Sequence, residues 1–199
     1  MPQRIAVLAS GAGTNLQAII DFHEQRQAGN AGIMSLVAAN RASAGALQRA
    51  RDAGIPAEIF DATDDGTALL GLLERYSIDL VVLAGYLKRI PAGVIRRFSG
   101  RIVNVHPGLL PDFGGPGMYG ARVHAAVLAS GATMTGVTVH LVDDEFDHGP
   151  VIAQWRVRVR MDDTAETLAN RVLAVEHLVY PRVVDMVAAL NSSDSSSDF

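Results

Sequence analysis

Short, nearly continuous apolar runs alternate with amphipathic stretches through the first half of the chain, and this alternation constrains the fold more than any other feature. The runs at 4–9 and 78–84 have the length of buried strands, and each passes directly into a glycine-containing turn. The segments 14–28, 44–53 and 67–76 space their apolar residues as helices do. Strands that are apolar on both faces belong to parallel sheets covered by helices. The sequence therefore predicts a doubly wound, mostly parallel, Rossmann-like α/β sheet. Further strands are expected at 34–39, 57–60 and 102–105, and further helices at 92–98 and 121–129.

The second half of the chain follows a different pattern. Segments 135–142 and 151–160 alternate polar and apolar residues, as half-exposed strands do, so an antiparallel pairing is expected there. A helix is expected over 164–190 with an interruption at Pro181, because proline removes a backbone donor. The Ser- and Asp-rich segment 191–199 is expected to be a disordered tail.

Composition narrows the function classes. The length suits one domain, predicted to span 1–190, and the chain has no cysteine, which excludes disulfides and cysteine nucleophiles. A net charge of -4 without a run of Lys or Arg indicates no nucleic-acid or membrane-surface partner. The short apolar start does not fit a secretory signal peptide, and no run is long enough to span a bilayer, so a cytoplasmic location is expected.

The turn after the first predicted strand, SGAGTN at 10–15, favours a phosphate-binding role. Glycine allows close backbone approach to an anion, and the start of the next helix attracts negative charge. The turn lacks the lysine of a P-loop, and Leu16 replaces the third glycine of a dinucleotide fingerprint. The turn therefore fits a monophosphate better than a nicotinamide cofactor. The alternative is a tight turn with Thr14 or Asn15 as a helix cap.

Asn104 and His106 end a predicted central strand. Residues two apart point to the same side of a strand, at the edge where open α/β sheets bind ligands. An amide donor beside an imidazole suits the stabilisation of an oxyanion, although both side chains also fit a role in capping the strand end.

A cluster of acidic residues at 143–147 offers a partner for His106. One of these carboxylates, brought near His106, is expected to raise the pKa of its imidazole and to relay a proton, while the rest form a solvated loop. Spacing alone does not say which member it is. No HExxH pair and no GxSxG elbow is present, so neither a metal site nor a serine hydrolase is expected.

Four motifs together resemble one known family. SGAGTNL at 10–16, LAGYL at 83–87, NVHPGLLP at 104–111 and DHGP at 147–150 resemble, in order, the phosphoribosylglycinamide formyltransferases of purine synthesis. The resemblance extends over nearly the whole chain. It implies a formyltransferase fold, 10-formyltetrahydrofolate as the formyl donor, glycinamide ribonucleotide as the acceptor and no metal. The oligomeric state is expected to be a monomer or a homodimer.

The resemblance also assigns residues. Asn104, His106 and Asp147 match the catalytic residues of the family, which singles out Asp147 from the acidic cluster. Gly13, Thr14 and Asn15 match its phosphate turn, and Glu176 matches the acid that binds the ribose. The positions that match its folate pocket are Leu87, Lys88, Arg89, Ile90, Asn104, Asp143, Asp144, Glu145, Phe146 and Asp147.

Some positions depart from the pattern of the family. The segment 61–64 is acidic where an arginine is usual, and Lys88 replaces a common arginine. The Gly-rich segment 113–120 replaces a shorter loop and is expected to be a mobile lid. His148 stands beside Asp147 in place of a small residue and is expected to face water.

Three other functions are compatible with parts of the sequence. A formyltetrahydrofolate hydrolase shares the Asn, His and Asp residues but is expected to carry an extra N-terminal regulatory domain. The strand expected to begin at Arg4 leaves no room for such a domain in this sequence, which disfavours the hydrolase. Methionyl-tRNA formyltransferase is expected to carry a basic C-terminal domain. A non-catalytic nucleotide-binding protein explains the phosphate turn but not the three reacting groups.

Overall fold

The computed structural model describes residues 2–26 and 29–194. The strands are β1 (Gln3–Ala9), β2 (Gly32–Ala39), β3 (Ala57–Ile59), β4 (Leu80–Leu83), β5 (Ile102–His106), β6 (Met134–Leu141) and β7 (Val151–Arg158). The helices are α1 (Thr14–Arg26), α2 (Gly45–Asp52), α3 (Thr67–Arg75), α4 (Ala92–Arg97), α5 (Ala121–Ala129) and α6 (Ala165–Asp194). The last two residues of the helix expected over 14–28 lie outside the described residues.

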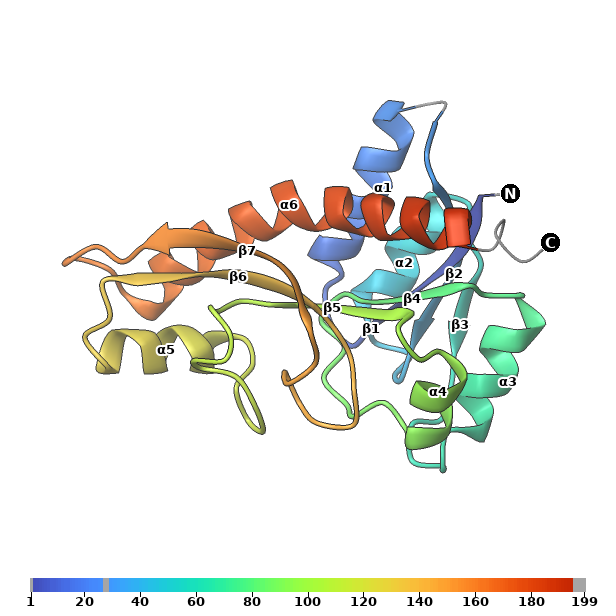
Figure 1. Cartoon of the computed structure of the whole chain (residues 1–199), viewed down its shortest axis with the longest axis horizontal. Coiled ribbons are helices and arrows are strands. Elements are labelled where there is room, and N and C mark those ends of the chain that lie inside the picture. The colour runs from blue at the N-terminus through green and yellow to red at the C-terminus, as the bar shows by residue number, and fades with distance from the viewer. Residues whose placement is uncertain (1, 27–28, 195–199) are drawn as a thin grey trace.

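The strands form one mixed sheet, and this confirms the predicted fold class. Within the described residues the order is β3-β2-β1-β4-β5-β6-β7, with β1 to β5 parallel to one another. The last two strands are antiparallel additions, as their alternating sequence predicted. Figure 1 shows β6 and β7 extending away from the parallel part of the sheet.

Two apolar cores sandwich the sheet because β1 is apolar on both faces. Ile5 and Val7 point into the core formed with α1, α2 and α6, whereas Ala6 and Leu8 point into the core formed with α3 and α4. Figure 1 places α6 along one side of the sheet and both α3 and α4 on the other. This sandwich leaves the carboxyl ends of the central strands open for ligands.

Helix α6 runs without interruption through Pro181, and this corrects the break expected there. Packing holds the helix across the missing backbone donor: Tyr180 and Val184 are fully buried in the core. The hydroxyl of Tyr180 also lies 2.9 Å from the carbonyl oxygen of Leu83. The helix extends to Asp194, so the first four residues of the tail expected at 191–199 are helical. Residues 195–199 lie outside the described residues.

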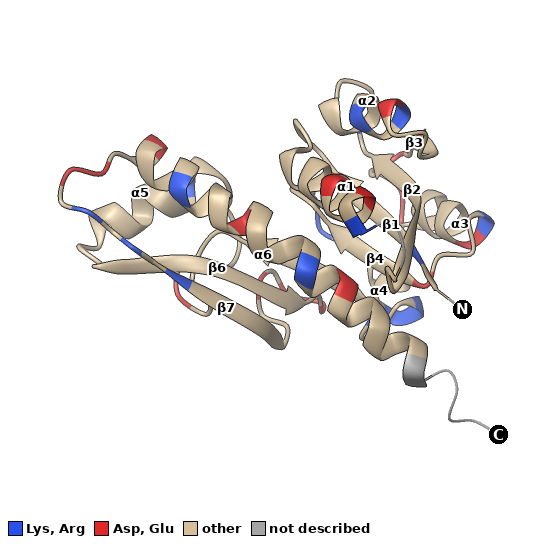
Figure 2. Ribbon diagram, turned by 90° about the horizontal axis from the view of Figure 1, so that it is seen from above, with Lys and Arg blue, Asp and Glu red and all other residues tan. Residues whose placement is uncertain are grey.

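Charges are mixed along the molecule. Figure 2 shows acidic and basic residues interspersed along α6, so this helix presents no continuous basic stripe. The absence of a nucleic-acid partner stays a prediction. In the described ranges, no helix combines the length and the apolar character that crossing a membrane requires.

Candidate active site

A cavity of about 410 Å³ opens at the carboxyl ends of β4 and β5. Its walls come from the segment after β4, the end of β5, the Gly-rich segment 115–121, the loop before β7 and helix α6. Asn104, His106, Asn15 and Glu176 all line this cavity. The topology therefore brings together residues that are far apart along the chain, at the sheet edge where ligands were expected.

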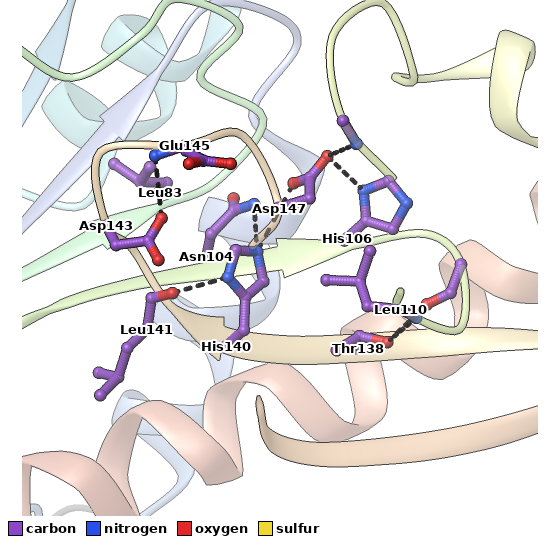
Figure 3. Close-up of polar contacts among 12 residues, drawn as sticks. Leu83, Asn104, His106, Leu110, Thr138, His140, Leu141, Asp143, Glu145 and Asp147 are labelled. Atoms are coloured by element: carbon purple, nitrogen blue, oxygen red, sulfur yellow. Dashed lines mark hydrogen bonds and ion pairs between the residues drawn. The ribbon is translucent and has the colours of Figure 1, made fainter. Parts of the chain in front are cut away.

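Strand register places three polar side chains on one face of the sheet. Asn104 and His106 are two residues apart in β5 and point to the same side, as predicted. Asn104 pairs with His140 of β6 in the antiparallel ladder, so these two side chains also share that face. Figure 3 shows the three side chains directed toward Asp147.

Asp147 is the acidic residue that reaches this face. Its Oδ2 lies 3.5 Å from Nδ1 of His106, and its Oδ1 lies 3.6 Å from Nε2 of His140. The backbone N–H of Gly115 donates to Oδ2 at 3.0 Å. Asp147 has a φ of 56°, a left-handed conformation that aspartate tolerates better than most residues. The structure thus selects Asp147 from the cluster at 143–147, which residue spacing left open.

The imidazole of His106 is buried and mostly neutral, whereas the sequence analysis expected a neighbouring carboxylate to raise its pKa. Burial lowers the pKa of His106, and this effect outweighs the neighbouring carboxylate of Asp147, which raises it. Nε2 lies 2.9 Å from the carbonyl oxygen of Phe113, an acceptor, so Nε2 carries the proton of the neutral ring. Nδ1 therefore faces Asp147 as a site that can take up a proton.

The carboxyl group of Asp147 stays ionised at neutral pH. Burial by itself raises the pKa of Asp147, but the charge that His140 and His106 carry when protonated and the N–H of Gly115 lower it below the usual value. An ionised carboxylate beside a neutral imidazole stabilises that imidazole when it becomes protonated. The pair is thus arranged to hold a proton temporarily.

His140 belongs to this network, although the sequence analysis did not place it in the site. Its Nδ1 lies 2.7 Å from the carbonyl oxygen of Leu141, so Nδ1 is the protonated nitrogen and Nε2 accepts. The amide nitrogen of Asn104 lies 3.1 Å from that Nε2. One N–H of the Asn104 amide is used in this contact and the other remains for a ligand. The signal for His140 is its antiparallel pairing with Asn104, which the sequence alone does not reveal.

Helix α2 holds the Gly-rich turn at 10–15 in shape. Gly13 has a φ of 75°, and a Cβ there would lie 2.7 Å from the Cα of Ala46. The Nε of Arg49 donates to the carbonyl oxygen of Ala12 at 2.9 Å. Of the three predicted phosphate-binding residues, Asn15 lines the cavity, whereas Gly13 and Thr14 lie outside its lining.

Glu176 lies at the junction of this turn and the cavity. Its carboxylate accepts a hydrogen bond of 2.6 Å from Nδ2 of Asn15. Burial raises the pKa of Glu176 to about 7, and the Asn15 contact only partly opposes the effect. The carboxyl group therefore gains or loses its charge in the neutral pH range. A ligand hydroxyl would compete with Asn15 for hydrogen bonds to this carboxyl group.

The predicted folate residues mostly line the cavity. Asp144 is the exception: its side chain is exposed, and its backbone carbonyl accepts a hydrogen bond from Arg89. His148 is exposed, as expected, and its Nδ1 contacts Asp143 at 2.9 Å, which raises the pKa of His148. The predicted folate residues that line the cavity are Leu87, Lys88, Arg89, Ile90, Asn104, Asp143, Glu145, Phe146 and Asp147.

The acidic segment 61–64, which stands where the family usually has an arginine, precedes helix α3. Asp64 accepts hydrogen bonds from the N–H groups of Gly66 and Ala68, at the first turn of α3.

In the part of the chain that the structure describes, no group of three or more His, Asp or Glu side chains is arranged to hold a metal ion.

The fold together with the sequence defines the class of the protein: the chain belongs to the formyl transferase family. Residues 3–184 match the formyl transferase family. The chain is 38% identical over 190 residues to phosphoribosylglycinamide formyltransferase of Escherichia coli, covering 92% of this chain and 86% of that protein. Within the class, the chain belongs to the phosphoribosylglycinamide formyltransferase family.

A solved structure and a plant relative agree with this assignment. Glycinamide ribonucleotide transformylase 1 of Symbiobacterium toebii superposes with a TM-score of 0.86 at 39% identity, over 94% of this chain and 88% of that one. The chloroplastic phosphoribosylglycinamide formyltransferase of Vigna unguiculata is 43% identical over 190 residues, which are 92% of this chain. The chain spans only 60% of the length of this plant relative.

Proposed function

We propose that this protein transfers the formyl group of 10-formyltetrahydrofolate to the amine of glycinamide ribonucleotide. The products are formylglycinamide ribonucleotide and tetrahydrofolate, and the pathway is purine synthesis. The observation that carries the proposal is the meeting of Asn104, His106 and Asp147 in one cavity that also contains Asn15 and Glu176. A binding protein has no need of the first three residues, and a hydrolase has no need of the other two.

The two substrates enter from different sides of the cavity. The phosphate of the ribonucleotide lies against the turn of Gly13, Thr14 and Asn15, where free N–H groups and the start of α1 favour an anion. The ribose hydroxyls donate to Glu176. The folate lies along the segment 87–90 and the loop at 143–147, with its formyl group beside Asn104.

The chemistry is a direct transfer through a tetrahedral intermediate. The amine nitrogen attacks the formyl carbon, and the N–H groups of Asn104 and His106 donate to the oxyanion that forms. His106 must release the carbonyl of Phe113 to do so. The pair formed by Asp147 and His106 accepts, through water, the single proton that the amine loses. The pair returns this proton to the folate nitrogen as the bond between the formyl carbon and that nitrogen breaks. Atoms and charge balance without another reactant.

An assay of tetrahydrofolate release tests the proposal. Purified protein is mixed with 10-formyltetrahydrofolate, with and without glycinamide ribonucleotide, and the absorbance of the released folate is followed. Release that requires the amine is expected. Equal release without it would identify a hydrolase, and binding of both compounds without release would identify a binding protein. Oligomeric state and a cytoplasmic location stay predictions.

Glu176→Gln is expected to weaken binding of the ribonucleotide. A neutral amide accepts weaker hydrogen bonds from the ribose than a carboxylate, so the KM for glycinamide ribonucleotide should rise about tenfold. In the wild type this KM should fall as the pH rises through the pKa of Glu176, about 7. Steady-state kinetics across that range checks both effects. A KM of the Gln variant with the same pH dependence as the wild type would contradict the role of Glu176.

The same substitution should stabilise the fold at alkaline pH. The pKa of Glu176 is raised from 4.5 in the unfolded chain to about 7 in the folded protein. As the pH rises, the unfolded chain therefore releases this proton before the folded protein does, and the free energy of unfolding falls between these two values. Removal of the buried charge should recover on the order of 3 kcal/mol above the upper value. Thermal unfolding of the wild type and of Glu176→Gln, at pH values below and above this range, measures the difference in stability between them. The difference should vanish at the acidic end of the range.

A further inference from the structure

His124 is a buried histidine that the proposed chemistry leaves unused. It lies in the first turns of α5, beside Val123 and one turn before Val127, and these three residues form the buried face of the helix. The valines belong to the apolar interior, whereas His124 lines the active-site cavity. A histidine on an apolar helix face needs a partner for its ring nitrogens.

That partner is missing in the described part of the chain. The side chain of His124 is only 3% exposed, and its Nδ1 is enclosed without a hydrogen bond. Burial lowers the pKa of His124, and the neighbouring His106 lowers it further, so the ring is neutral at pH 7. A neutral imidazole has one donor and one acceptor nitrogen. Nδ1 therefore has a hydrogen-bonding capacity that no described residue meets.

The position of His124 indicates which substrate approaches it. Helix α5 packs against α6, which carries Glu176, and His124 lines the same cavity as Glu176, His106 and Asn104. A ribonucleotide held by its ribose at Glu176 must extend its glycinamide arm across this cavity to reach a formyl group beside Asn104. That arm carries amide and amine N–H groups. The reacting nitrogen of 10-formyltetrahydrofolate carries no hydrogen, so the folate offers no donor there.

We propose that His124 accepts a hydrogen bond from an N–H of the glycinamide arm and thereby orients the amine toward the formyl carbon. This inference rests on the proposed function and adds a contact to the same site. It makes His124 a determinant of specificity: the residue distinguishes a ribonucleotide with the glycinamide arm from one that has only the phosphate and the ribose.

His124→Phe tests the contact while keeping a planar ring in the buried position. The variant should lower kcat/KM for glycinamide ribonucleotide about tenfold, because an N–H of the bound arm loses its acceptor. The KM for 10-formyltetrahydrofolate should stay unchanged. Inhibition by ribose 5-phosphate, which has no glycinamide arm, should also stay unchanged. His124→Asn, whose amide oxygen can occupy the position near Nδ1, should recover part of the loss.

His23→Phe is the matched control. His23 is also buried, at 9% exposed, its Nε2 has no partner among the described residues and burial lowers its pKa. It lines a separate hollow near the end of α1. Its replacement should leave all kinetic constants unchanged. Equal losses for glycinamide ribonucleotide and ribose 5-phosphate in His124→Phe, or no loss for either, would overturn the inference.

A measurement on the wild type tests the contact even if His124→Phe fails to fold. In protein labelled with ¹⁵N in the histidine rings, glycinamide ribonucleotide should shift the resonance of the accepting nitrogen of His124, and ribose 5-phosphate should not. The same shift with both compounds, or with neither, would refute the contact. Absence of wild-type turnover would refute the proposed function, whereas turnover with an unaffected His124→Phe would refute only this inference.

Discussion

Asp147→Asn is expected to lower kcat by about a thousandfold, since general acid–base groups contribute on this scale. The substitution preserves the size of the side chain but removes the charge that stabilises a protonated His106, 3.5 Å away. It also removes the group that carries the proton of the amine. The KM values of both substrates should change little, because Asp147 acts mainly after they have bound. Single-turnover kinetics separates the chemical step from binding.

Asp185→Asn is a suitable control for this prediction. Asp185 is a buried carboxylate at 8% exposed, remote from the cavity, whose oxygens contact the N–H of Ala31 and the guanidinium of Arg26. Its replacement should lower the melting temperature but leave kcat of the folded protein unchanged. If Asp147→Asn kept more than about a tenth of the wild-type kcat, a role in general acid–base catalysis would be untenable.

Asn104→Ala is expected to lower kcat by about a hundredfold or more, the usual cost of removing one oxyanion donor. The amide nitrogen lies 3.1 Å from Nε2 of His140, a contact that orients the amide, and the free N–H is left to bind the oxyanion. Alanine removes both functions. The loss should fall on kcat and kcat/KM alike, because the interaction develops only in the transition state.

Asn30→Ala provides the comparison for this second prediction. The amide of Asn30 donates to the carbonyl oxygen of His23 at 3.0 Å, in the connection between α1 and β2, away from the cavity. The variant should unfold at a slightly lower temperature and turn over normally. A normal kcat with a raised folate KM in Asn104→Ala would mean that Asn104 only binds the folate and does not stabilise the oxyanion.

The parallel part of the fold could be read from the sequence because it depends on local patterns. The strand run at 4–9 is apolar at every position from Ile5 to Ala9, and such a strand must be covered on both faces. The alternation in 135–142 and 151–160 likewise predicted antiparallel strands, found as β6 and β7. The half-exposed character holds for β7 but not for β6, which is largely buried because it lies inside the sheet, between β5 and β7. The interruption expected at Pro181 was wrong because core packing, which sequence patterns do not report, holds the helix together.

The site was only partly predictable for the same reason. Asn104 and His106 belong to one strand, so their common direction follows from the local period of two. The pKa of His106 was expected to rise beside a carboxylate, but it falls because burial has the larger effect. Burial depends on how the Gly-rich segment 113–120 folds over the strand, where Phe113 and Gly115 contact His106 and Asp147.

The sequence by itself determined the class of sheet, the common direction of Asn104 and His106 and, through its motifs, the family. Only the tertiary structure decided that His140 joins Asn104 to Asp147, that Glu176 contacts Asn15 and that His124 lines the cavity. Local patterns report which face of an element is buried, because that face repeats with the period of the backbone. Contacts between distant segments depend on strand register and helix packing, which arise only when the whole chain is folded.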